Sequence, residues 1–235
     1  MPTATWAERR GELLTYFDRK AAEAWTRLTS DAPVGRIRAT VRAGREEMRA
    51  ALLSWLPGEM RGRRLLDAGC GTGALAVEAA RRGAEVVAID LSPTLIGLAR
   101  ERAAAAGAQG PGRVEFRVGD MLDPTPGRFD HVAAMDSLIH YRAPDMARAL
   151  SVLAARAERS VVFTFAPRTS ALAAMHAVGR LFPRGDRAPA VEPVAEAVLR
   201  RLLAREPGLA GWSVARTLRV ARGFYISQAM ELRRA

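Results

Sequence analysis

The run Leu65–Gly73, with the letters LLDAGCGTG, constrains the fold of this chain more than any other feature. Two apolar residues end a predicted buried strand, an acid follows, and three alternating glycines lead into a predicted helix. Glycine lets the main chain turn tightly and approach a ligand closely, because it has no Cβ. The first amides of the helix then point at that ligand. The run therefore predicts a nucleoside-cofactor site at the end of a strand.

Strands and helices alternate on both sides of this run. Strands are expected at 63–68, 84–90, 114–118, 129–135, 160–165, 212–220 and 223–232. Helices are expected at 6–30, 34–56, 73–82, 93–106, 144–156 and 194–204. This alternation predicts an α/β chain with a doubly wound, Rossmann-like, mostly parallel seven-stranded sheet, whose ligands lie at the carboxyl ends of the strands.

The length of 235 residues favours one domain. Within it we expect a helical arm at 1–56, a cofactor-binding core at 57–167, an insertion or lid at 168–205 and C-terminal strands at 206–235.

Three acids at three strand ends indicate which cofactor is bound. Asp67 stands two residues before Gly69, Asp90 ends the next strand, and Asp120 ends the third. The Asp67 carboxylate could bind a cationic amino group. Asp90 could accept hydrogen bonds from a ribose diol, and Asp120 could accept one from an adenine amino group. The pattern D-x-G-x-G-x-G, then Asp, then Gly-Asp resembles the class I methyltransferase superfamily, which implies S-adenosylmethionine. We expect the cofactor to be bound by Asp67, Gly69, Gly71, Asp90, Leu91, Asp120, Met121 and Met135.

A nicotinamide dinucleotide is the alternative cofactor. Gly69, Gly71 and Ala74 fit the pattern G-x-G-x-x-G/A, and Asp90 follows at about the expected distance. Against it, the Asp67 carboxylate would repel a pyrophosphate.

Composition narrows the class of protein. The hydrophobic content of 49% indicates a globular chain, and the single cysteine, Cys70, suits a reducing cytoplasm. We expect Cys70 to be a small buried residue of the glycine loop and not a nucleophile. We see no run long enough to cross a membrane and no export signal. The chain is therefore expected in the cytoplasm.

The net charge is +11, and 35 of the 36 cationic residues are arginines, since Lys20 is the only lysine. A solvated basic surface is the simplest interpretation, and an acidic partner or an anionic lipid are the functional ones. Nucleic acid fits poorly, because the arginines are spread along the chain and no binding module is recognisable.

The segment after the fourth strand, residues 135–141, should border the reacting groups. His140 is a candidate base, hydrogen-bond donor or axial metal ligand, or else a structural histidine. Asp136 either holds the cofactor's methionine end or caps the following turn, and His131 is expected in the core. The arginines of the insertion form either a lid over an apolar anionic substrate or an amphipathic surface helix; they are Arg168, Arg180, Arg184 and Arg187.

Runs outside the glycine loop carry a narrower resemblance, from about residue 14 to the end of the chain. They lie at 16–19, 25–28, 37–45, 135–141, 163–169, 181–184 and 223–227. Together they resemble the magnesium-protoporphyrin IX O-methyltransferase family of bacteriochlorophyll synthesis. The resemblance implies methyl transfer to a propionate carboxylate of magnesium protoporphyrin IX, giving the monomethyl ester.

The same resemblance implies catalytic residues and partners. His140 and Tyr16 would touch the reacting propionate, with His140 alternatively meeting the porphyrin magnesium and Tyr16 carried on a helix that folds over the site. We see no protein metal site, so magnesium is expected only within the substrate. Handover from a magnesium chelatase, peripheral contact with the photosynthetic membrane and a monomeric state are further expectations. A quinone-pathway phenol O-methyltransferase and a non-catalytic porphyrin carrier are the alternatives.

Overall fold

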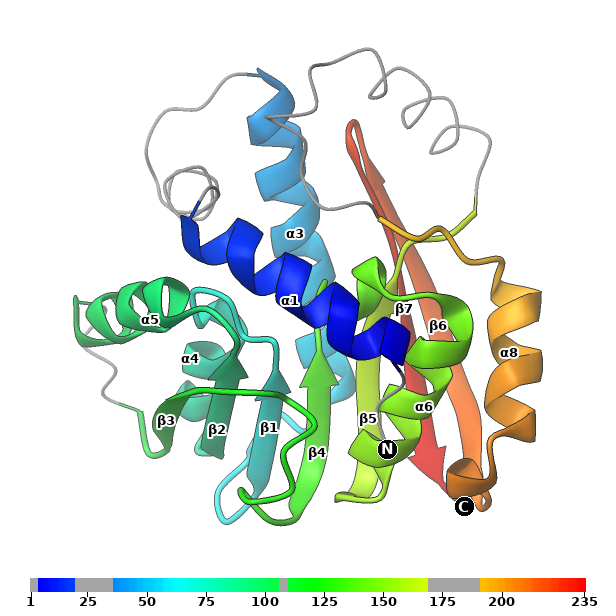
Figure 1. The fold of residues 1–235 in the computed structure, drawn as a ribbon. Coiled ribbons are helices and arrows are strands. Elements are labelled where there is room, and N and C mark those ends of the chain that lie inside the picture. Colours follow the sequence, from blue (N-terminus) through cyan, green and yellow to red (C-terminus); the bar gives the residue numbers. More distant parts are fainter. Residues whose placement is uncertain (1–3, 20–35, 106–109, 169–190) are drawn as a thin grey trace.

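The computed structural model describes residues 4–19, 36–105, 110–168 and 191–235. Its centre is a seven-stranded sheet in the order β3-β2-β1-β4-β5-β7-β6 (Figure 1). The strands are β1 Arg64–Ala68, β2 Glu85–Asp90, β3 Arg113–Val118, β4 Phe129–Ala134, β5 Ala157–Phe165, β6 Trp212–Arg222 and β7 Tyr225–Arg234. Strands β1 to β5 are parallel, and β7 runs antiparallel between β5 and β6. The predicted Rossmann-like fold is confirmed.

Helices cover both faces of this sheet. The α-helices are α1 Ala4–Arg19, α3 Arg36–Trp55, α4 Ala74–Arg81, α5 Pro93–Ala105, α6 Ala143–Ala154 and α8 Glu196–Arg205. The described residues also form the short 3-10 helices η1 Leu138–His140 and η3 Pro207–Leu209. The predicted first helix extended to residue 30, whereas α1 ends at Arg19 and residues 20–35 lie outside the described part. Most of the predicted insertion, 169–190 with Arg180, Arg184 and Arg187, lies outside it too.

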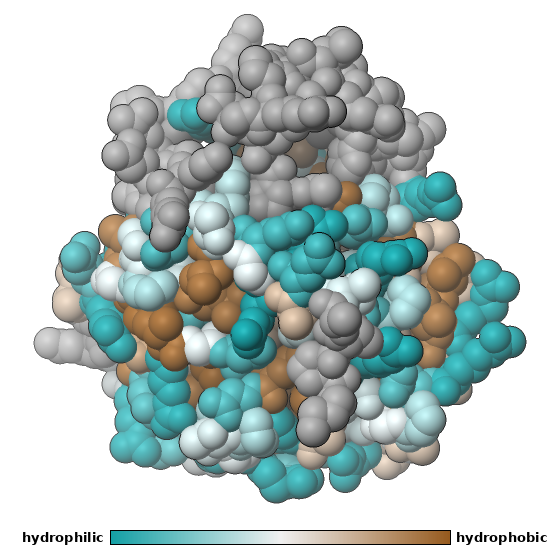
Figure 2. Space-filling view, viewed as in Figure 1, coloured by the Kyte–Doolittle hydropathy of each residue, from teal (hydrophilic) through white to brown (hydrophobic). Residues whose placement is uncertain are grey.

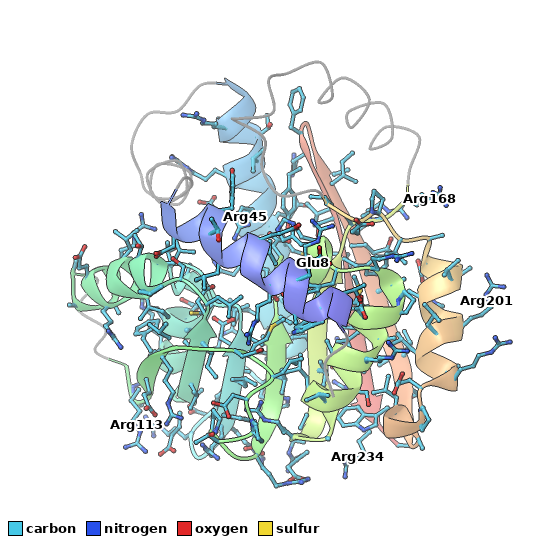
Figure 3. All side chains as sticks on the ribbon, in the orientation of Figure 1. Glu8, Arg45, Arg113, Arg168, Arg201 and Arg234 are labelled. Atoms are coloured by element: carbon cyan, nitrogen blue, oxygen red, sulfur yellow. The ribbon has the colours of Figure 1, made fainter. Side chains whose placement is uncertain are left out.

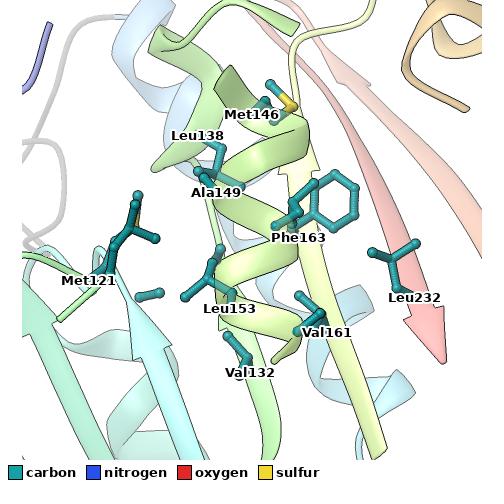
Figure 4. Close-up of a cluster of buried hydrophobic side chains, with 14 of the residues drawn as sticks. Met121, Val132, Leu138, Met146, Ala149, Leu153, Val161, Phe163 and Leu232 are labelled. Carbon is teal, nitrogen blue, oxygen red and sulfur yellow. The ribbon is translucent and has the colours of Figure 1, made fainter. Parts of the chain in front are cut away.

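The central strands are apolar because both of their faces are buried. In β1, Leu65 packs into the core beneath α3, α4 and α5, while the next residue, Leu66, packs into the core on the opposite face. Figure 4 shows part of that second core, where α6 lies over β4 and β5 with Leu153 above Val161 and Val132. The sheet is therefore held between two apolar layers, and its strand ends are fixed in space.

His131 lies in the core, as predicted. It is 5% exposed, and its Nδ1 atom lies 2.7 Å from the Ser160 hydroxyl on β5. Burial lowers the pKa of His131 to about 4, so the ring is neutral at physiological pH.

Helix α1 lies across the carboxyl ends of the parallel strands (Figure 1). Trp6 stacks on Tyr141 with ring centroids 3.7 Å apart, and the Thr5 hydroxyl bonds Asp145 at 2.8 Å. At its other end, Asp18 accepts a hydrogen bond from Thr94 at 2.8 Å. On this face of the molecule, apolar surface gathers beside α1 towards α5 (Figure 2). The arm thus covers the edge at which the acids of β1, β2 and β3 are expected.

Candidate active site

One cavity lies beneath α1 at the carboxyl ends of β1, β2 and β4. All eight residues predicted to bind the cofactor line it, and so does His140. These residues are Asp67, Gly69, Gly71, Asp90, Leu91, Asp120, Met121, Met135 and His140. The strand-end acids and the candidate catalytic histidine therefore share one space.

The glycine loop needs its glycines for two physical reasons. Gly69, Gly71 and Gly73 all have positive φ angles, of 79°, 55° and 78°, which side chains disfavour. In addition, a Cβ at Gly69 would lie 2.3 Å from the Cβ of Ser137. The loop is tied to β2 by the amides of Gly69 and Cys70, which both donate to the carbonyl oxygen of Ile89.

Cys70 departs from its expected burial. It is half-buried, because it lines the cavity while packing against the core that contains Leu65. Burial of the sulfur atom, with a contribution from Asp67 and Asp90, raises the pKa of its thiol well above the ordinary value. The thiol is therefore protonated at neutral pH and is a poor nucleophile.

Asp90 links the glycine loop to the end of β2. Its carboxylate accepts hydrogen bonds from the Gly71 amide at 2.8 Å and from the Ser92 amide at 3.0 Å. Burial raises its pKa, and the two amides act in the opposite direction. A carboxylate has about four acceptor positions, so both oxygens can still accept from a ribose diol.

Asp67 is the most unusual acid of the cavity. Its side chain is 2% exposed, and its Oδ2 atom is buried without a hydrogen-bond partner in the part of the chain that the structure describes. Burial, and then the neighbouring Asp90, raise the pKa of Asp67 to about 7. A buried acceptor without a donor is costly, so the geometry fits a ligand that brings a cationic N–H group. A pyrophosphate would not supply one.

Asp120 has a partner that the sequence did not indicate. Its Oδ1 atom accepts from the Leu122 amide at 2.9 Å, and its Oδ2 atom pairs with Arg10 of α1 at 2.7 Å. The arm is thereby bonded directly to the acid that was expected to meet adenine. No motif marks Arg10, because the two residues are 110 positions apart.

The segment after β4 places both His140 and Asp136 in the lining of the cavity, and a contact of Asp136 with the cofactor's methionine end stays a prediction. His140 is 7% exposed and ends the short helix η1. That helix has Ser137 at its N-cap without a side-chain cap bond, so the capping role of Asp136 is wrong. The Asp136 carboxylate instead pairs with Arg45 at 2.7 Å and accepts from the Tyr225 hydroxyl at 3.1 Å.

Tyr16 is not among the residues that line the cavity. It lies half-buried on α1, and burial raises its pKa. Two other residues of the same helix, Trp6 and Leu13, do line the cavity. The catalytic role of Tyr16 stays a prediction.

Helix α3 contributes a charged wall that sequence reasoning missed. Arg42, Arg45, Glu46 and Arg49 line the cavity, and their spacing places them on one face of a helix. Figure 3 shows Arg45 at the sheet end beside α1, whereas Arg113, Arg201 and Arg234 project outward elsewhere. Arg49 is half-buried, and no described residue forms an ion pair or hydrogen bond with its guanidinium. The helical spacing of these arginines was the available signal.

Two family models match this chain. The first, described as Magnesium-protoporphyrin IX methyltransferase C-terminus, matches residues 134–234. The second, described as Methyltransferase domain, matches residues 65–158.

Three known proteins illustrate how far the similarity extends. Magnesium-protoporphyrin O-methyltransferase of Rhodobacter capsulatus is 50% identical over 229 residues, which cover 97% of this chain and 98% of that protein. Ubiquinone biosynthesis O-methyltransferase of Xanthomonas euvesicatoria pv. vesicatoria is 39% identical over 132 residues, but these cover only 54% of this chain and 55% of that protein. The crystal structure of magnesium protoporphyrin IX methyltransferase from Synechocystis PCC 6803 with bound SAH has a TM-score of 0.84 and 30% identity, covering 96% of this chain and 100% of that one.

The extent of these matches decides between the two enzyme classes. Similarity to the ubiquinone-pathway enzyme stops at about half of either chain, whereas similarity to the magnesium-protoporphyrin enzymes spans nearly all of both. This chain therefore belongs to the magnesium-protoporphyrin O-methyltransferase family.

Proposed function

We propose that this chain transfers a methyl group from S-adenosylmethionine to a propionate carboxylate of magnesium protoporphyrin IX, giving the monomethyl ester. The observation that carries the proposal is the cavity that Asp67 and His140 line together, where the Asp67 Oδ2 atom has no hydrogen-bond partner among the described residues. The relative that is 50% identical over nearly the whole chain supports this choice of substrate.

The cofactor, when bound, supplies an electrophilic methyl group on a sulfonium. Asp67 would accept the N–H groups of its ammonium, and Asp90 would accept from its ribose diol. Asp120 would accept a hydrogen bond from the adenine amino group. Leu91, Met121 and Met135, which all line the cavity, would form apolar walls around the adenine ring.

The acceptor requires little acid–base chemistry from the protein. A carboxylic acid such as a propionate is already ionised near pH 7. The chain must instead remove water from this carboxylate and align one oxygen with the methyl group. His140, buried in the cavity, is placed to donate a hydrogen bond to the other oxygen. Tyr16 is proposed as a second donor, although it must move relative to its half-buried position to reach the cavity.

Arg49 is a candidate for holding a second carboxylate of the substrate. Its guanidinium lines the cavity and lacks an anionic partner within the described residues. An arginine fork suits a carboxylate bidentately, and magnesium protoporphyrin IX carries two propionates. The unreacted propionate would then neutralise this arginine.

A methyl-transfer assay with two acceptors tests the proposal. Purified protein is incubated with S-adenosylmethionine labelled in its methyl group, and with either magnesium protoporphyrin IX or a catechol. Label in the porphyrin, released as methanol by alkaline hydrolysis of the ester, is the expected result. Label in the catechol alone would instead identify a phenol O-methyltransferase. Tight porphyrin binding without transfer, retained in Asp67→Asn, would identify a carrier.

The oligomeric state, the location and the partners of the protein are also part of the proposal. The described part of the chain contains no helix that is long and apolar enough to cross a membrane. We propose a monomer in the cytoplasm that receives its substrate from a magnesium chelatase and touches an anionic photosynthetic membrane peripherally. The net charge of +11 supports such contact. Co-sedimentation with anionic vesicles, compared with neutral ones, tests the membrane contact.

A further inference from the structure

Asp136 is the only non-glycine residue with a positive φ in the described part of the chain, at 53°. This left-handed conformation is unfavourable for most residues that carry a Cβ, although aspartate adopts it more often than others. Asp136 lies between the end of β4 and the helix η1 that carries His140. Strain of this kind persists only where the surroundings hold it in place, so the contacts of Asp136 require an explanation.

Three distant elements hold the Asp136 side chain. Its carboxylate, 5% exposed, pairs with Arg45 of α3 at 2.7 Å. The Tyr225 hydroxyl at the start of β7 lies 3.1 and 3.2 Å from its two oxygens, and the Thr164 hydroxyl on β5 lies 3.1 Å away. Thr164 also accepts the backbone N–H of Asp136 at 2.7 Å. The strained residue is therefore fixed through both its main chain and its side chain.

The ring of Tyr225 is fixed in turn by α3. A Cβ added to Gly44 would lie 2.5 Å from Cδ1 of this ring, so only glycine lets the helix approach so closely. Gly44 immediately precedes Arg45, and one turn of α3 thus supplies both the space for the Tyr225 ring and the cation for Asp136. The runs 37–45 and 223–227, distant in sequence, therefore meet at Asp136.

The fixed residue determines where the next segment lies. Ser137 follows Asp136 directly, and its Cβ would be 2.3 Å from a Cβ on Gly69, so this segment rests on the glycine loop. His140 then enters the cavity at the end of η1. Asp136 therefore lies at the start of the segment that carries His140 past the glycine loop into the cavity.

We propose that Asp136, Arg45 and Tyr225 form a positioning unit that holds the His140 segment against the glycine loop. The unit acts through His140 and therefore rests on the proposed methyl transfer for its effect on rate. Its structural part, the placement of the His140 ring, does not depend on that activity.

Two conservative variants test the positioning unit: one removes a hydroxyl of the unit, and the other is a matched control outside it. Tyr225→Phe removes only the hydroxyl that bonds Asp136, and Ser160→Ala removes a buried hydroxyl that bonds His131 at the far end of the sheet. The chain has 3 histidines, so ¹H–¹³C correlation spectra of the imidazole Cε1–H groups contain one peak per ring. Each peak is assigned from a single His→Gln variant.

In Tyr225→Phe we expect the His140 peak to move while the His131 peak stays, and in Ser160→Ala the reverse. Tyr225→Phe should also lower kcat about tenfold, because small displacements of a catalytic group have large effects on rate. The KM for S-adenosylmethionine and the Kd for S-adenosylhomocysteine should change less than about twofold. Ser160→Ala should leave kcat unchanged. Thr164→Val, which removes another hydroxyl that bonds Asp136, should behave like Tyr225→Phe.

Other outcomes overturn the inference. If the His140 peak and kcat stay unchanged in both Tyr225→Phe and Thr164→Val, the unit does not position the histidine. If Tyr225→Phe moves both histidine peaks and weakens S-adenosylhomocysteine binding, the hydroxyl serves general stability only. If the wild-type protein transfers no methyl group, the proposed function fails, and the spectra still decide the positioning.

Discussion

Asp67 makes the pH dependence of cofactor binding a direct test of the site. Its carboxyl group is buried, and burial together with Asp90 raises its pKa to about 7 in the cofactor-free protein. A ligand with an ammonium group favours the ionised carboxylate, so binding releases a proton wherever the free site is protonated. Affinity for S-adenosylhomocysteine should therefore fall as the pH falls through 7.

The expected size follows from the pKa. Between about pH 7.5 and about pH 6 the affinity should fall about eightfold, or roughly 1.3 kcal/mol. Isothermal titration calorimetry in buffers of different ionisation enthalpy counts the released protons. We expect nearly one proton per site at about pH 6, and about a quarter of one at about pH 7.5.

Asp67→Asn should raise the stability of the cofactor-free protein and lower its affinity for S-adenosylhomocysteine. The folded-state pKa of Asp67 is raised above the unfolded value of about 3.9. The folded state therefore binds this proton more tightly, and stability falls as the pH rises from about 4 to about 7, by at most about 4 kcal/mol. Removing the acid should raise the Tm of the cofactor-free protein at neutral pH. Affinity for S-adenosylhomocysteine should drop roughly 10- to 100-fold, the value of a charged hydrogen bond.

Asp130→Asn is the matched control. Asp130 lies at the opposite end of the sheet, where it pairs with Arg63 at 3.0 Å and Arg159 at 3.2 Å. This variant should keep the wild-type pH dependence of binding. An affinity that is independent of pH, with no proton released by the wild-type protein, would refute the reasoning about Asp67.

Four further substitutions have distinct expected results. His140→Phe should lower kcat at least about tenfold in the methyl-transfer assay while the Kd for S-adenosylhomocysteine stays within about twofold, because the ring orients only the acceptor; unchanged turnover would contradict its role. Tyr16→Phe should lower kcat by a smaller factor, and full activity would remove Tyr16 from the catalytic residues. Arg49→Met should raise the KM for magnesium protoporphyrin about fivefold with little change in kcat, since one charge contact is lost; an unchanged KM would place the second propionate elsewhere. Gly69→Ala should cost more than about 2 kcal/mol of unfolding free energy in denaturant titrations, because the positive φ and the contact with Ser137 both exclude a Cβ.

The sheet, and the gathering of the strand-end acids and the glycine loop around one cavity, were predictable because they depend on local patterns. Buried parallel strands are continuous apolar runs, and their carboxyl ends meet at one edge. The acids that follow those runs, such as Asp67 and Asp90, therefore had to lie close together. Glycine spacing then located the loop that crosses that edge.

The contacts that complete the site were not predictable, because they join residues that are far apart in sequence. Arg45 and Asp136 are separated by 91 positions, and Arg10 and Asp120 by 110. A single acid after a strand fits a turn cap, a ligand contact or an ion pair equally well, and nothing near Asp136 distinguished them. The contacts of its carboxylate with Tyr225 and Arg45, which are distant in sequence, account for its left-handed backbone.

The place of β7 in the sheet has a consequence for how the protein is made. Strand β7 lies between β5 and β6, although both are synthesised before it. Until the ribosome has extruded β7, each of them has an unpaired edge that it would have shared with that strand, and such edges invite wrong pairing. Tyr225 also begins β7, so its contact with Asp136 cannot form before this strand has been synthesised. The glycine loop thus leaves the ribosome well before the strand that completes the contacts of Asp136.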